Sequence, residues 1–277
     1  MDPLVTTEWL AAELGARDLR IADATLLDPA LGRDAHADFD AGHIPGAVFL
    51  DLAELRDTDS ALPNMLPPIA KVASRLGRLG LGDGTRIILY DDSPWRSAAR
   101  AWWLIRNHQI GDVAILDGGL AKWRAEGRPL ETGAATPRSR HATPRFAPTH
   151  LRTLHQMRAN LESGAEQVID ARSPGRFTGA EADPHGAAPG HIPGSRSLHY
   201  PRLFNPDGTY KRGEALAAEF AGIDLDRPIV TTCGSGVTAA TLAFALHLMG
   251  RDAALYDGSW SEWGGRADTP KALGDAA

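Results

Sequence analysis

The chain has 277 residues, of which 43% are hydrophobic, and a formal net charge of −6. A chain of this length can bury more than one core, so we expect two domains. The acidic balance argues against a surface that binds nucleic acid or anionic membranes, and no apolar run approaches the ~20 residues of a membrane-spanning helix. The single cysteine permits no internal disulfide and the N-terminus lacks an apolar signal stretch, so we expect a cytoplasmic protein.

Helices and strands alternate in the predicted secondary structure of the first half. Helices are predicted at residues 7–14, 34–41, 69–79, 97–107 and 120–126, and strands at 19–23, 47–50, 86–90 and 113–116. This alternation is typical of an α/β domain with a mostly parallel sheet flanked by helices. Ligands usually bind at the carboxyl ends of the strands of such a sheet.

A proline-containing stretch without apolar periodicity, residues 132–149, is predicted to be a linker. The alternation then returns, with helices predicted at 151–162, 214–220 and 238–249, and strands at 167–170, 195–199, 229–232 and 253–256. We expect a long loop between 170 and 191, a turn at 260–263 and a loose tail at 267–277.

Several motifs occur twice in the same order. Gly-His-Ile-Pro-Gly at residues 42–46 recurs unchanged at 190–194, and Asp117 with Trp123 matches Asp257 with Trp263. Repeated motifs in a fixed order indicate that each half is a copy of one domain. We therefore predict a first domain at 1–131, the linker at 132–149 and a second domain at 150–277.

The only cysteine, Cys233, lies between the β-branched run 229–232 and an apolar helix, in the loop Cys-Gly-Ser-Gly-Val-Thr. A strand, a tight glycine loop and a helix direct backbone N–H groups and the positive end of a helix dipole into one small bowl, which favours a thiolate nucleophile. Gly234 and Gly236 leave room for an anion to approach the backbone. An inert buried cysteine is the commoner case, but it would explain neither the glycines nor the position.

Comparison of the two copies indicates which one is active. Asp91 stands in the first half where Cys233 stands in the second, and a carboxylate cannot perform the sulfur chemistry of a thiolate. We predict that the first domain is an inactive copy, free to contribute side chains to the site. A phosphatase loop would need an arginine where this chain has Ala239, and the histidines show no metal-ligand spacing, so we expect neither a phosphatase nor a metal site.

Together, these motifs resemble those of tandem-domain rhodanese-type sulfurtransferases, and the 233–238 loop is similar to that of 3-mercaptopyruvate sulfurtransferases. Thiosulfate-preferring relatives usually carry two basic residues where this chain has Gly234 and Ser235. The resemblance implies two rhodanese-like domains and transfer of a sulfane sulfur from a small-molecule donor, 3-mercaptopyruvate, through a Cys233 persulfide. Pyruvate would be released, and a thiol acceptor such as thioredoxin or a low-molecular-weight thiol, or cyanide, would take the sulfur. This implied chemistry needs no metal and no organic cofactor.

Two alternatives remain open. The first is a thiosulfate:cyanide sulfurtransferase, which would form the same persulfide from another donor. The second is a non-catalytic rhodanese-like protein that binds a ligand or senses redox state, although retention of the whole 233–238 loop speaks against it.

The resemblance also assigns roles to individual residues. Arg176 matches the family arginine that binds the substrate carboxylate, which a guanidinium grips well. His185 lies in the stretch where relatives usually carry a second substrate-binding arginine, and an exposed histidine without a role is the alternative that stays open. The residues expected to bind substrate are Arg176, His185, Gly234, Gly236, Val237 and Thr238. Arg172 is expected to form a structural ion pair with Asp170.

A catalytic relay is a further implication of the resemblance. Ser235 resembles a serine that works with an aspartate and a histidine of the first domain, and the matching positions are Asp34 and His43. The identical His191 in the other copy favours a different explanation, in which both histidines brace the same turn. Both explanations remain open for His43.

Overall fold

The computed structural model describes residues 1–275, and these residues form two five-stranded sheets. Residues 276 and 277, which end the predicted tail and second domain, lie outside the described residues. The first compact unit comprises Met1–Thr58, Leu66–Ala147 and Phe204–Tyr210. The second comprises Asp59–Met65, Pro148–Leu203 and the chain from Lys211 onward.

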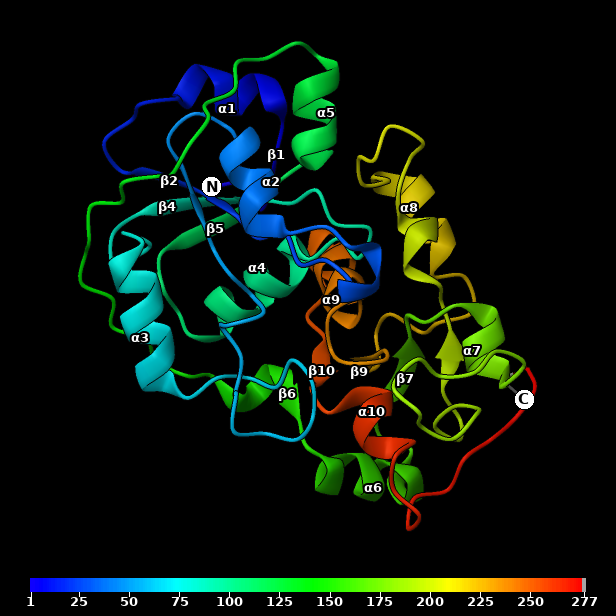
Figure 1. The fold of residues 1–277 in the computed structure, drawn as a ribbon. Helices are drawn as coiled ribbons and strands as arrows, with labels where there is room; N and C mark the ends of the chain where they lie inside the picture. The colour runs from blue at the N-terminus through cyan, green and yellow to red at the C-terminus, as the bar shows by residue number, and fades with distance from the viewer. Residues whose placement is uncertain (276–277) are drawn as a thin grey trace. The chain divides into compact units, whose positions relative to one another are not determined.

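The sheet of the first unit has the order β1-β5-β4-β2-β3, and its strands pair in parallel, as predicted for an α/β fold (Figure 1). The strands are β1 (Leu4–Val5), β2 (Leu19–Asp23), β3 (Ala47–Phe49), β4 (Arg86–Tyr90) and β5 (Asp112–Leu116). The helices are α1 (Thr7–Glu13), α2 (Ala35–Ala41), α3 (Ile69–Arg78), α4 (Ala98–Asn107) and α5 (Gly119–Ala125), with a 3₁₀ turn at Pro29–Leu31.

Alternation along β4 explains how both faces of this sheet are covered. Ile88 and Tyr90 belong to one buried cluster with Phe39 of α2 and Trp123 of α5. The intervening residue Leu89 faces the opposite side, because successive strand residues point to opposite faces, and α4 packs there against β4 and β5. β4 is therefore buried on both faces, as its continuous apolar run predicts.

The sheet of the second unit has the equivalent order, β6-β10-β9-β7-β8, and is also parallel. Its strands are β6 (Leu151–Arg152), β7 (Gln167–Asp170), β8 (Arg196–Ser197), β9 (Ile229–Thr232) and β10 (Ala254–Tyr256). Its helices are α6 (Leu154–Ser163), α7 (Pro174–Thr178), α8 (Gly213–Glu219), α9 (Ala239–Leu248) and α10 (Ser259–Trp263), with 3₁₀ turns at Pro148–His150 and Tyr200–Leu203. The matching strand orders confirm the internal repeat.

β9 lies at the centre of the core of the second unit. Val230 and Tyr256 share a buried cluster with Met157 of α6 and with Trp260 and Trp263 of α10. α9 packs against β9 and β10, and eight of its ten residues are buried, which explains its apolar sequence. In both units, the loop that follows the central strand begins at the carboxyl edge of the sheet, at Asp91 in the first and Cys233 in the second.

Several predicted elements need correction. The helix predicted at 151–162 is preceded by strand β6, and it begins only at Leu154, because Thr153 and Gln156 form a reciprocal capping box. The predicted long loop contains α7, which Ser173 caps by accepting a hydrogen bond from the Arg176 N–H. The predicted turn at 260–263 is helix α10.

The prediction of a loose tail is wrong for residues 267–275. Ala272 and His191 form an antiparallel backbone bridge, and the indole Nε1 of Trp263 donates to the carbonyl of Pro270 over 2.8 Å. Thr269 is buried and also bonds to the carbonyl of Trp263. These contacts fix the segment against the second unit.

The segment predicted as a linker lies along the first unit up to Ala147. The Arg140 N–H donates to the Gly77 carbonyl over 2.8 Å, and the Ala147 N–H donates to the Asn107 carbonyl over 2.8 Å. A Cβ on Gly77 would lie 2.9 Å from the Arg140 carbonyl oxygen, so glycine permits this close passage.

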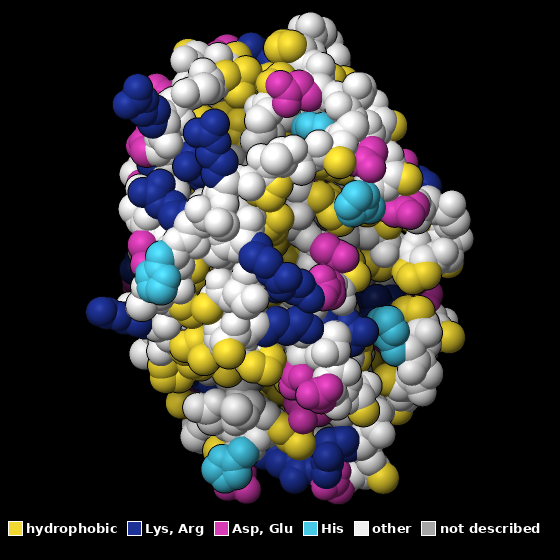
Figure 2. Space-filling view, turned by 60° about the vertical axis from the view of Figure 1, so that its left-hand side comes forward, with side chains coloured by type: hydrophobic (Ala, Val, Ile, Leu, Met, Phe, Trp, Pro, Cys, Tyr) yellow, Lys and Arg dark blue, Asp and Glu magenta, His cyan; other side chains and the backbone are white. Residues whose placement is uncertain are grey.

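Charged side chains are interspersed on the surface that Figure 2 shows, with Lys and Arg (dark blue) among Asp and Glu (magenta). Charged side chains among the described residues also form ion pairs, such as Arg86 with Asp18 and Arg152 with Glu166. In residues 1–275, no helix is long and apolar enough to cross a membrane.

Candidate active site

Cys233 lies at the carboxyl end of β9, in a loop of small residues that runs into α9. The residue is 1% exposed, and its Sγ accepts a hydrogen bond from the Gly236 N–H over 3.1 Å. Gly236 has a φ of +82°, a left-handed conformation that suits glycine and turns this N–H back toward the sulfur. The loop therefore supplies at least one backbone donor to negative charge on the sulfur.

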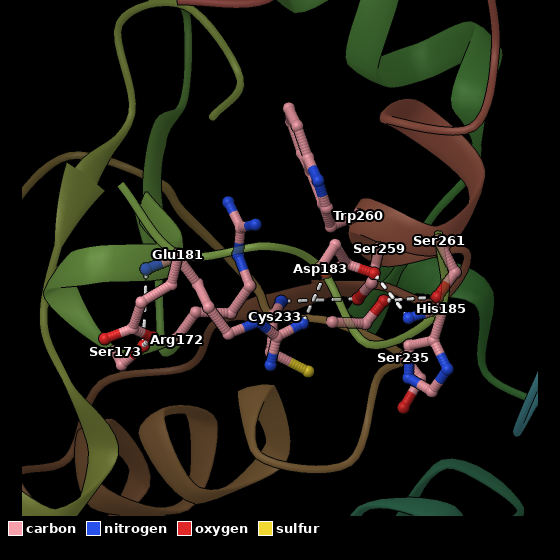
Figure 3. Close-up of polar contacts among 12 residues, drawn as sticks. Arg172, Ser173, Glu181, Asp183, His185, Cys233, Ser235, Ser259, Trp260 and Ser261 are labelled. Atoms are coloured by element: carbon pink, nitrogen blue, oxygen red, sulfur yellow. Dashed lines mark hydrogen bonds and ion pairs between the residues drawn. The ribbon is translucent and has the colours of Figure 1, made fainter. Parts of the chain in front are cut away.

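The first turn of α10 lies beside the loop and forms hydrogen bonds with its backbone (Figure 3). The Trp260 N–H donates to the Cys233 carbonyl over 2.9 Å, and the Ser261 N–H donates to the Gly234 carbonyl over 2.8 Å. A trans peptide directs its C=O and its N–H in opposite directions, so the N–H groups of Gly234 and Ser235 point away from α10. The Gly236 N–H is the one donor observed at the sulfur among the described residues, and participation of these two further N–H groups in the predicted amide bowl stays a prediction.

Ser259 is a supporting residue that the sequence analysis missed. It is fully buried and has a φ of +49°, which is unusual for a residue with a side chain. Its hydroxyl donates to the Tyr256 carbonyl over 2.8 Å and accepts from the Cys233 N–H over 3.3 Å. The first half has Gly119 at this position, so the change from glycine to serine between the repeats was the available signal.

Arg176 reaches the cysteine loop from α7. A Cβ on Gly234 would lie 2.8 Å from Arg176 Nη2, which places the guanidinium over Gly234. The same Nη2 forms an ion pair with Asp183 Oδ2 at 2.6 Å, and Arg176 Nε is buried without a hydrogen-bond partner among the described residues. The guanidinium therefore lies at the cysteine loop with its Nη atoms nearest to Gly234.

Asp183 is the residue that orients Arg176, and its side chain is only 3% exposed. Burial opposes its ionisation, but hydrogen bonds from Arg176 and from the backbone N–H of His185 outweigh this effect and lower the pKa of Asp183 below its ordinary value. The carboxylate therefore stays charged and holds the guanidinium in place. The sequence analysis did not single out Asp183.

His185 lies in the same loop as Asp183 and is exposed, and its backbone N–H donates to Asp183 Oδ1 over 2.9 Å. Figure 3 shows the imidazole projecting from the loop. A contact between this ring and a substrate stays a prediction.

The remaining predicted residues of the loop differ in exposure. Ser235 and Thr238 are half-buried, whereas Val237 is buried. Ser235 Oγ accepts a hydrogen bond from Asn64 Nδ2 over 3.0 Å. Asn64 belongs to the segment Asp59–Met65 of the second compact unit, and no sequence signal near it pointed to the site.

His43 and Asp34 both make structural contacts within the first unit. His43 is 3% exposed, its ring stacks on Phe39 at 3.9 Å, and its Nδ1 lies 2.8 Å from the Phe39 carbonyl. His191 repeats this arrangement on Phe177, which is the turn-bracing role that the sequence allows. Asp34 caps α2 by accepting hydrogen bonds from two backbone N–H groups. A catalytic role for either residue stays a prediction.

Asp91 shows what the equivalent loop of the first unit holds. Its carboxylate accepts hydrogen bonds from the Ala98 N–H over 2.7 Å and from the Ser93 N–H over 3.0 Å. Burial raises the pKa of Asp91 even though these bonds oppose the shift. A carboxylate thus receives backbone donors at the position where the second unit has a thiol.

Arg172 and Asp170 form the predicted ion pair at 2.7 Å, and both side chains are 1% exposed. Within residues 1–275, no three His, Cys, Asp or Glu side chains are grouped so that they could hold a metal ion.

Comparison with known proteins identifies close relatives of this chain. The family model described as "Rhodanese-like domain" matches residues 6–126 and 153–266. The chain is 39% identical over 274 residues to human 3-mercaptopyruvate sulfurtransferase, covering 95% of this chain and 92% of the human protein. It is 37% identical to thiosulfate sulfurtransferase of Cricetulus griseus, covering 94% and 91%.

A solved structure agrees with the sequence relatives. SseA from Escherichia coli, described with the "Rhodanese" fold and catalytic mechanism of 3-mercaptopyruvate sulfotransferases, superimposes with a TM-score of 0.86. The two share 36% sequence identity, and the match covers 95% of this chain and 100% of SseA.

Proposed function

We propose, from the premise that this chain belongs to the rhodanese-like family and is a sulfurtransferase, that it takes sulfur from 3-mercaptopyruvate through a persulfide on Cys233. The observation that carries the proposal is the pairing of two features at one loop. Cys233 Sγ accepts a hydrogen bond from the Gly236 N–H, and the Arg176 guanidinium lies over the neighbouring Gly234.

The first half-reaction moves one sulfur atom. The Cys233 thiolate attacks the sulfur of 3-mercaptopyruvate, an S–S bond forms, and the C–S bond of the donor breaks. The electron pair of the broken bond passes into the pyruvate enolate, which takes up the proton that the donor thiol gives up and becomes pyruvate. Cys233 is left as a persulfide whose outer sulfur carries negative charge, which backbone N–H groups of the loop stabilise.

Arg176 provides the means of holding the donor. A carboxylate fits the planar fork of a guanidinium, and Asp183 keeps this guanidinium over the loop. His185, Val237, Thr238 and the glycines complete the proposed substrate-binding set. We leave Asp34 and His43 out of the mechanism, because each already has a structural partner in its own unit.

The second half-reaction returns the enzyme to its starting state. An acceptor thiolate attacks the outer sulfur of the persulfide, a new S–S bond forms on the acceptor, and the Cys233 thiolate leaves. A reduced thioredoxin or a small thiol has the required chemistry, and cyanide would yield thiocyanate. A free cysteine fits a reducing compartment, so we propose the cytoplasm.

Thiosulfate is the alternative donor, since relatives named for each substrate are similarly close. Thiosulfate is a dianion, and basic side chains beside the cysteine would attract it strongly at short range. Gly234 and Ser235 add no positive charge to that of Arg176, which is already paired with Asp183. The lack of basic residues at positions 234 and 235 supports 3-mercaptopyruvate, and not thiosulfate, as the preferred donor.

A burst experiment tests the proposal. The protein is mixed with excess 3-mercaptopyruvate without any acceptor, and pyruvate is measured with a coupled dehydrogenase. We expect a rapid burst of about one pyruvate per Cys233, followed by steady turnover when a reduced thiol is added. Absence of pyruvate in both phases would overturn the proposal.

A further inference from the structure

The segment Asp59–Met65 lies in the compact unit that holds Cys233, although it comes from between β3 and α3 in the sequence. Asn64 in this segment has a φ of +56°, a left-handed conformation that asparagine tolerates better than most residues with a Cβ. Its side-chain Nδ2 donates to Ser235 Oγ over 3.0 Å. The loop that follows β9 thus has a polar neighbour that does not come from its own half of the sequence.

The direction of this hydrogen bond determines where the hydroxyl hydrogen of Ser235 can point. A carboxamide NH₂ group only donates, so the serine oxygen is the acceptor in this contact. A hydroxyl carries one hydrogen, which is then directed away from Nδ2 and is available to another acceptor. Ser235 is half-buried and lies two residues after Cys233, so its side chain is close to any molecule bound at the thiol.

We propose that Asn64 is a positioning residue, which holds the Ser235 hydroxyl as a hydrogen-bond donor to the carbonyl oxygen of the sulfur donor. This inference rests on the proposed function. Negative charge develops on that oxygen as the C–S bond breaks and the enolate forms, and a fixed donor stabilises such charge. A carboxamide does not titrate near neutral pH, so Asn64 provides orientation and no proton relay.

The test compares single-turnover pyruvate release in two variants. Asn64→Gly removes the amide without backbone strain, because glycine accepts a positive φ. Gln109→Gly is the matched control, since Gln109 is an exposed amide residue with a φ of +52° in the first unit. We expect the rate at saturating 3-mercaptopyruvate to fall about tenfold for Asn64→Gly, with KM changed less, and to stay at the wild-type value for the control.

A double-mutant cycle separates positioning from a structural effect. Ser235→Ala should slow the reaction by about the same factor, and adding Asn64→Gly to it should cost nothing further, because Asn64 acts through the serine. Equal rates for Asn64→Gly and the control, or independent losses in the double variant, would overturn the assignment. A wild-type protein that releases no pyruvate would instead overturn the proposed function.

Discussion

The guanidinium of Arg176 lies so close to Gly234 that a Cβ on residue 234 would be 2.8 Å from Nη2. The sequence suggests that glycine keeps the loop backbone open to an anion. The structure adds a second reason, because the space above this glycine is occupied by the residue proposed to bind the substrate carboxylate. Position 234 and Arg176 are therefore coupled.

This coupling predicts the effect of Gly234→Ala. The flexible end of Arg176 can move aside, so we expect little change in the free energy of unfolding. The displaced guanidinium would lose its alignment with the substrate carboxylate, and KM for 3-mercaptopyruvate should rise about tenfold, because a charged hydrogen bond is worth about 1.5–3 kcal/mol. Steady-state kinetics and thermal unfolding measure the two effects. In an Arg176→Ala background the same substitution should leave KM unchanged, and a further rise would refute the coupling.

Donor preference gives a second prediction. We expect a higher kcat/KM for 3-mercaptopyruvate than for thiosulfate. Gly234→Arg together with Ser235→Lys should narrow or reverse the gap, but the new arginine would collide with Arg176. Ser235→Lys alone leaves the space of Arg176 free, but it also removes the proposed hydroxyl donor, so the measure of the added charge is the rise in kcat/KM for thiosulfate itself. A wild-type preference for thiosulfate would contradict the proposed donor.

His185 leads to a prediction about substrate binding. If its imidazole hydrogen-bonds to the substrate carboxylate, His185→Ala should raise KM for 3-mercaptopyruvate by about tenfold, because such a bond is worth about 1.5 kcal/mol. His185→Arg should lower KM, because a guanidinium binds a carboxylate through two parallel hydrogen bonds, with little change in kcat. Steady-state kinetics at fixed pH and ionic strength measure both effects. Equal KM values for wild type and His185→Ala would show that the exposed ring takes no part in binding.

Stability should depend on pH through a buried carboxyl group at the end of β2. Burial raises the pKa of Asp23 to about 6, although hydrogen bonds from Thr25 oppose the shift. A folded-state pKa above the unfolded value means that the folded state binds the proton more tightly, so this group's contribution falls as pH rises from about 4 to 6. Asp23→Asn should remove that contribution, which amounts to at most about 3 kcal/mol. Urea unfolding of both proteins across this range measures it, and parallel curves would exclude the effect.

The central strands could be predicted to the residue, because continuous apolar and β-branched runs such as 86–90 and 229–232 leave little ambiguity. The edge strands β1 and β6, two residues each, are too short to show any period. Helix α7 also escaped prediction, because five residues contain little more than one turn.

The same distinction applies to the candidate site. Cys233 and its glycines form one contiguous loop, so the motif was visible in the sequence. Ser259 and Asn64 reach that loop from distant segments, and only the folded chain shows the hydrogen bonds they make. Asp183 escaped notice because its role depends on the position of Arg176 in space.

The measurement that tests the account most directly is the mass of the Cys233-containing peptide after incubation with 3-mercaptopyruvate and no acceptor. We predict an added mass of about 32 Da, one sulfur atom, which a reduced thiol then removes. Cys233→Ser should show neither the adduct nor sulfur transfer, because a serine hydroxyl cannot replace the thiolate. Asp91→Ala should retain the adduct and turn over within about a few-fold of wild type. An unmodified Cys233 in a protein that still releases pyruvate, or substantial transfer by Cys233→Ser, would contradict the persulfide mechanism.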